Sequence, residues 1–60
     1  MKLTFNMERE TKNTIRFNEV LANDTDIPVI GPLYVNKSAL RAMGWTQNKS
    51  LEVELTVKEA

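Results

Sequence analysis

The last third of the chain has a pattern that few folds can accommodate. Between residues 51 and 58, apolar and polar side chains alternate without a break, which is typical of a strand with one buried face. Residues 37–43 precede it with helical spacing, and Gly44 stands where a left-handed residue ends a helix. Residues 46–49 are turn formers. The pattern therefore predicts a short helix, a turn and a final strand.

The predicted helix is short and has one apolar side. Ala39, Leu40 and Met43 recur at helical spacing, so we expect this side to pack inward. Asn36 or Ser38 is suited to cap its first turn by accepting a backbone N–H bond.

The first twenty residues predict a β-hairpin. Residues 2–10 alternate around Leu3, Phe5 and Met7, and residues 14–20 alternate around Ile15 and Phe17. Opposed residues of an antiparallel pair share a face, so Met7 should face Phe17.

That register makes further predictions about the hairpin. It pairs Glu10 with Thr14, places Glu8 opposite Arg16 as a charge pair, and leaves a three-residue loop. Such a loop favours a left-handed residue near its end, and Asn13 is the best candidate.

The middle of the chain predicts a loop and a third strand. Residues 21–28 include the turn-forming cluster Asn23–Asp26, whose spacing lacks the glycine and glutamate of a calcium-binding loop. Residues 29–35 read as extended, although Gly31-Pro32 makes the first half an edge or a bulge. Tyr34 should point away from Leu33 and Val35.

The length predicts one small domain over residues 1–60, and the alternating segments predict a mostly β fold with a single short helix near residues 37–43. The chain has no cysteine for a disulfide or a zinc site. A domain of 60 residues without such staples commonly enlarges its core through a second subunit, so we expect a homodimer. A monomeric β domain of five elements is the alternative.

The C-terminal half resembles the swapped-hairpin fold of the AbrB and MazE families over residues 33–57. The matching residues are Val35-Asn36-Lys37, Met43-Gly44, Trp45 and Leu51-Glu52-Val53-Glu54-Leu55. Asn36 replaces the family's proline, and Asn48-Lys49 replaces its Gly-Asp. The resemblance implies an interleaved homodimer with shared strands, and a DNA-binding regulator or antitoxin. It transfers no site residue, because the family's basic residues lie in the N-terminal portion, which does not align.

A second resemblance gives less information about the protein. Residues 11–14 and 30–35 are similar to segments of short uncharacterised bacterial and phage proteins. That likeness implies no function.

No catalytic constellation is present, so we expect no enzyme, no cofactor and no bound metal. The chain has no histidine, which removes the commonest general base. Glu52 and Glu54 lie in an outward row of the last strand, and neither Ser38 nor Ser50 has a neighbouring base.

Two functions from different classes remain. The first is a dimeric DNA-binding regulator, and the second is a protein-binding adaptor or inhibitor that does not contact nucleic acid. The partners would be a second copy of the chain with either duplex DNA or a protein such as a toxin. The candidate DNA contacts are Arg9, Lys12, Arg16, Lys37 and Arg41.

Charge and aromatic residues favour different hypotheses. Eight basic and eight acidic residues give a net charge of zero, which is unfavourable for a strong polyanion binder. Tyr34 and Trp45 are the candidate partner contacts. A core or dimer contact is nevertheless favoured for Tyr34, and Trp45 is better suited to close the core behind the helix. No apolar run is long enough to span a membrane, and we expect a cytoplasmic protein.

Overall fold

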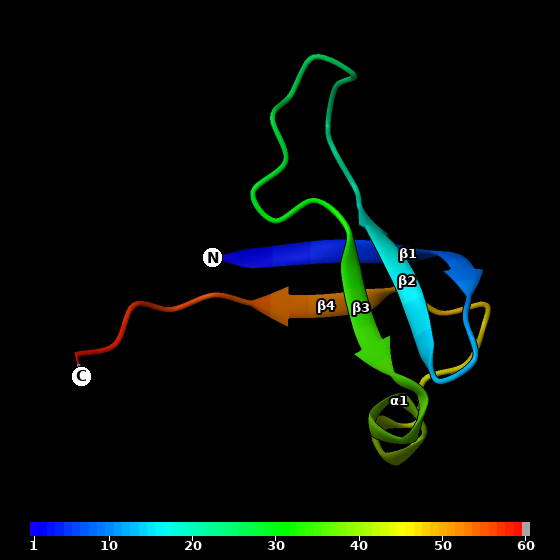
Figure 1. Cartoon of the computed structure of the whole chain (residues 1–60). Coiled ribbons are helices and arrows are strands. Elements are labelled where there is room, and N and C mark those ends of the chain that lie inside the picture. Colours follow the sequence, from blue (N-terminus) through cyan, green and yellow to red (C-terminus); the bar gives the residue numbers. More distant parts are fainter. Residues whose placement is uncertain (60) are drawn as a thin grey trace.

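The computed structural model describes residues 1–59 and has four antiparallel strands and one helix (Figure 1). The sheet is curled into a half-barrel with the strand order β3-β2-β1-β4. The mostly β fold with an N-terminal hairpin is therefore confirmed. The elements are β1 (Lys2–Glu10), β2 (Thr14–Glu19), β3 (Leu33–Asn36), α1 (Lys37–Met43) and β4 (Leu51–Glu54).

The core lies inside the curl of the sheet, beneath α1. Phe5, Ile15 and Phe17 come from the inner face of the hairpin, and Leu40 comes from the helix. Partly buried side chains surround this group, namely Leu3, Met7, Ile30, Leu33, Val35, Trp45, Leu51 and Val53. The alternation of apolar residues along the strands therefore predicts the inner face correctly.

The hairpin has the predicted face matching but not the predicted register near its loop. Met7 opposes Phe17 as expected. A bulge between Met7 and Arg9 then shifts the pairing by one residue. Glu10 consequently opposes Ile15 rather than Thr14, and Arg9 rather than Glu8 opposes Arg16. A bulge leaves two residues facing one, which alternation in the sequence does not reveal.

The hairpin loop is closed by a threonine rather than by a left-handed asparagine. No residue other than glycine has a positive φ among residues 1–59, so the prediction for Asn13 is wrong. Instead, the backbone N–H of Thr11 donates to the carbonyl oxygen of Thr14 at 2.9 Å. The backbone N–H of Thr14 donates back to Oγ1 of Thr11 at 3.1 Å. The threonine side chain therefore supplies the local bonds that stabilise the turn.

The helix begins and ends at the predicted residues, but it buries less than expected. The Oδ1 atom of Asn36 accepts the backbone N–H of Ser38 at 2.9 Å, and Gly44 ends the helix at φ +80°. Only Leu40 of the helix is buried, whereas Met43 is 62% exposed and Ala39 is also exposed. The inward packing expected of Ala39 and Met43 is therefore wrong, because a two-turn helix at the end of the sheet directs one residue into the core.

Two strands are shorter than the sequence predicts. The third strand begins at Leu33 instead of residue 29, since Gly31 adopts φ +86° just before Pro32. The fourth strand ends at Glu54 rather than residue 58. It pairs with β1 from Phe5–Leu51 to Lys2–Glu54, so it stops where β1 runs out of residues.

All four strands pair within one chain. β3 pairs with β2, and β4 pairs with β1, so that the segment from β3 to β4 crosses from one edge of the sheet to the other. This is the arrangement of the monomeric alternative, and the interleaved homodimer stays a prediction. Within residues 1–59 there is no helix of the length and apolar character needed to cross a membrane.

Candidate nucleic-acid interface

The outer face of the sheet brings two arginines and a tyrosine together. Arg9 opposes Arg16 across β1 and β2, and Arg16 opposes Tyr34 across β2 and β3. The three side chains therefore form a row across three adjacent strands. We call Arg9, Arg16 and Tyr34 the arginine–tyrosine row. The bulge creates this row, because without the extra residue Glu8 would stand opposite Arg16 in place of Arg9.

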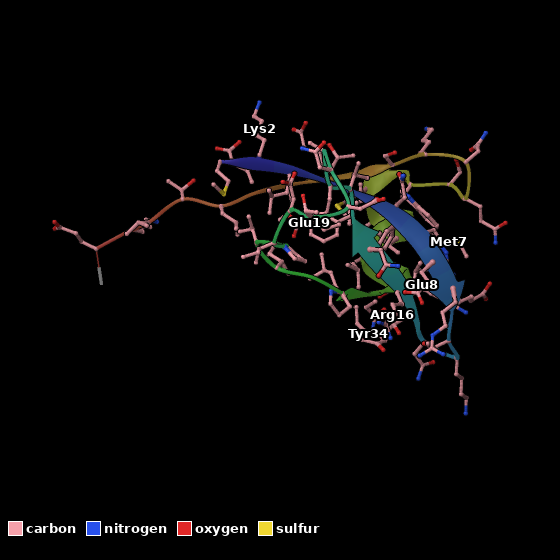
Figure 2. The ribbon with its side chains drawn as sticks, turned by 90° about the horizontal axis from the view of Figure 1, so that it is seen from above. Lys2, Met7, Glu8, Arg16, Glu19 and Tyr34 are labelled. Carbon is pink, nitrogen blue, oxygen red and sulfur yellow. The ribbon has the colours of Figure 1, made fainter. Side chains whose placement is uncertain are left out.

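Arg16 is the centre of the row and contacts Tyr34 and Glu8, which are labelled beside it in Figure 2. Its Nη1 donates to the hydroxyl oxygen of Tyr34 at 3.2 Å, and its Cζ lies 5.7 Å from the ring centroid. Its Nε lies 2.8 Å from Oε2 of Glu8. That Nε is buried and makes no well-aligned hydrogen bond, so the Glu8 contact is an ion pair and not a directed bond. The expected pairing of Glu8 with Arg16 is thus confirmed despite the changed register.

The arginine–tyrosine row keeps a positive local charge although Glu8 lies beside it. The guanidinium groups of Arg9 and then Arg16 lower the pKa of the Tyr34 phenol, and Arg16 donates a hydrogen bond to its oxygen. A lowered pKa means that negative charge is favoured at that position. Two arginines against one glutamate leave a local charge of +1, and Tyr34 is 52% exposed. Such a surface can receive an anionic group without closing around it.

The other three basic candidates lie elsewhere. Lys12 is exposed in the hairpin loop. Lys37, at the start of α1, pairs with Glu10 on the inner side of the sheet. Arg41 is exposed on the helix and lines an open pocket of about 220 Å³ together with Lys37 and Trp45. The structure therefore brings Arg9 and Arg16 together and separates Lys37 and Arg41 from them.

The two aromatic candidates have different surroundings. Trp45 packs edge-on against Phe17, with ring centroids 5.4 Å apart, and its Nε1 donates to the carbonyl oxygen of Lys49 at 2.8 Å. Its core role, predicted from the position after the helix, is confirmed. Tyr34 points outward as expected and is the accessible one of the two.

Glu19 is a structurally important residue that the sequence does not indicate. Its carboxylate accepts backbone N–H groups from Val29, Ile30 and Gly31 at 3.0, 2.8 and 3.2 Å. It thereby anchors the return of the long loop at residues 20–32, which extends away from α1 in Figure 1. A contact across ten or more residues has no local signature. Loop length was the only available indication, since long ordered loops need tethers.

Comparison with known proteins adds no constraint. No family model, curated protein or solved structure matches this chain. Among the described residues, no cluster of three or more acidic, histidine or cysteine side chains could hold a metal ion. The row is thus an open cationic and aromatic surface, whose chemistry suits reversible binding of anions.

Proposed function

We propose that this protein is a small, non-enzymatic binding protein whose arginine–tyrosine row contacts the phosphate backbone of duplex DNA. The observation that carries the proposal is the register shift at Glu8, which places Arg9 directly opposite Arg16, the residue that opposes Tyr34 on its other side. Arginine binds phosphate in a bidentate manner, and phosphate contacts supply most nonspecific DNA affinity.

The biological role we propose is that of a dimeric regulator or antitoxin-like factor that is AbrB/MazE-like in the order of its C-terminal elements. The order β3, α1, β4 supports it, since this is the segment on which the resemblance rests. The zero net charge sets the strength of binding that we expect. Without a general positive field, the contact should be weak and strongly dependent on salt, with a dissociation constant of roughly 10⁻⁴–10⁻⁶ M.

The proposal is tested by titrating the protein into a labelled DNA duplex at two salt concentrations. Arg9→Ala and Arg16→Ala should each weaken binding about tenfold near 0.1 M salt and lower the salt slope by about one. Arg41→Ala is the matched control, because it removes the same charge from the helix. Equal losses for all three variants, or binding that ignores salt, would refute the row as the interface.

A second candidate function, a protein-binding adaptor, is favoured by the loop between β2 and β3. Ile27 is 87% exposed, and Val29 and Val20 are 53% and 49% exposed. Exposed apolar side chains on a long loop are suited to partner contact. Ile27→Ser should then abolish capture of a protein partner while the arginine variants retain it. The DNA-binding proposal predicts that Ile27→Ser leaves DNA affinity unchanged.

A further inference from the structure

The C-terminal segment has more alternating residues than its own sheet can pair. Leu55 still exchanges two backbone bonds with Met1, at 2.7 and 2.8 Å. Residues 56–59 continue past the N-terminus without a neighbouring strand (Figure 1). Val57 is 99% exposed there. The alternating pattern thus extends into a region where one chain offers it no partner.

The backbone of this segment is oriented for pairing on its open side. Both polar backbone groups of Leu55 face Met1. Because these groups alternate in direction along a strand, those of residues 52, 54, 56 and 58 face outward when the segment stays extended. An open edge of this kind is a template for another strand.

We propose that a second copy of this chain pairs antiparallel with the β4 edge, about a twofold axis that passes through Leu55. The two copies of Leu55 then face each other, and Val53 faces the partner's Val57. Residue 54 of each copy exchanges backbone hydrogen bonds with residue 56 of the other copy. Residue 52 does the same with residue 58. The two half-barrel sheets become one continuous sheet.

Charge complementarity supports this register. Glu52 opposes Thr4 within its own sheet, whereas Glu54 already opposes Lys2. The ion pairs among residues 1–59 include neither Glu52 nor Lys58. In the proposed dimer Glu52 faces the partner's Lys58, and the symmetry forms this pair twice.

Neighbouring registers match less well. A shift by one residue would place apolar side chains opposite polar ones. An axis through Glu54 would oppose two glutamates. An axis through Thr56 would oppose two threonines and pair Lys58 with the partner's Glu54, which already opposes Lys2 in its own sheet. The axis through Leu55 forms three apolar pairs, one more than the axis through Thr56. It also pairs Lys58 with Glu52, which has no charged residue opposite it in its own sheet.

The other free edge of the sheet is less suited to self-pairing. β3 has four residues, and it is bounded by Pro32 on one side and by α1 on the other. Proline and short length are common protections of an edge strand. No overhanging segment continues β3 in an extended form.

The first experiment uses the absence of cysteine from the chain. Leu55→Cys places two thiols opposite each other at a non-hydrogen-bonded pair, where side chains approach most closely. Mild oxidation should therefore convert it to a covalent dimer. Val57→Cys is the matched control, since it faces Val53 and should stay uncrosslinked. Equal cross-linking of both variants would overturn the proposed axis, and so would an interleaved dimer that Leu55→Cys fails to lock.

The second experiment reverses charges and measures mass by sedimentation. The wild-type chain should form a species of about twice 6.9 kDa. Lys58→Glu should weaken this dimer about tenfold, and adding Glu52→Lys should restore it. Adding Glu54→Lys instead should not restore it. A wild-type protein that remains at 6.9 kDa, or rescue by Glu54→Lys alone, would overturn the proposal.

The dimer proposal does not depend on DNA binding. The axis would present the arginine–tyrosine row twice, so loss of the dimer should reduce DNA affinity through loss of avidity. The sedimentation and cross-linking measurements contain no DNA. Their failure can therefore be distinguished from a failure of the proposed function.

Discussion

At the scale of single residues, the arrangement depends on side chains that bond to distant backbone groups. Glu19 binds three successive N–H groups of the β2–β3 loop. These bonds lower its pKa from the ordinary value of 4.5, with the N–H groups of Ile30 and then Val29 contributing most. The role of Glu19 could not be predicted, because its partners are ten or more residues away and are set by tertiary structure.

The lowered pKa of Glu19 predicts an acid-dependent loss of stability. In the unfolded chain Glu19 titrates near 4.5, and in the folded chain it titrates lower. Its contribution is therefore complete above pH 4.5 and disappears as the pH falls through the folded-state value. Glu19→Gln should lower the melting temperature at pH 7, and its difference from wild type should shrink towards pH 3. A difference that is independent of pH would contradict the tether.

At the scale of elements, sequence patterns located the strands and the helix but not every boundary. Alternation identified both hairpin strands, and Gly44 marked the end of the helix. Alternation also predicted a strand to residue 58, whereas pairing ends with the available length of β1. The bulge at Glu8 places Arg9 instead of Glu8 opposite Arg16, and that change creates the candidate site. Sequence patterns indicate which face of the sheet a residue prefers. The neighbouring strands determine how long a strand is and in which register it pairs.

The helix stop can be tested at Gly44, which has φ +80° and open space around an added Cβ. Its N–H donates to the carbonyl oxygen of Arg41 at 3.1 Å, and Trp45 follows with a bond to Leu40 at 3.0 Å. Gly44→Ala meets no atom, so its cost is the left-handed backbone alone, about 1 kcal/mol. Urea denaturation should show this reduction in the free energy of unfolding. If Gly44→Ala left the free energy of unfolding unchanged, the helix would have to end at another residue.

At the scale of the whole molecule, the local charge of the outer face and the net charge of the chain favour different hypotheses about DNA binding. The zero net charge argues against general attraction to polyanions, whereas the arginine–tyrosine row is locally positive. Residue types alone gave five basic residues as candidate DNA contacts. The fold brings Arg9 and Arg16 onto one surface, because the strand register determines which side chains lie together.

The role of local charge can be separated from that of net charge with two glutamates. Glu8→Gln removes the ion pair on Arg16, which is 2.8 Å long, while Glu59→Gln changes net charge equally in the C-terminal segment. Glu8→Gln should tighten DNA binding about two- to fivefold, in keeping with a partly exposed ion pair. Glu59→Gln should have a smaller effect in the same fluorescence titration. Equal effects would assign the binding to net charge.

The most direct test of the central claim is a map of amide chemical-shift changes when a short DNA duplex is added to the ¹⁵N-labelled protein. The account predicts that the largest changes cluster at Arg9, Arg16 and Tyr34, that they diminish with added salt, and that α1 changes little. Changes centred on α1 or on the loop of residues 20–32, or no change at all, would contradict the proposed interface.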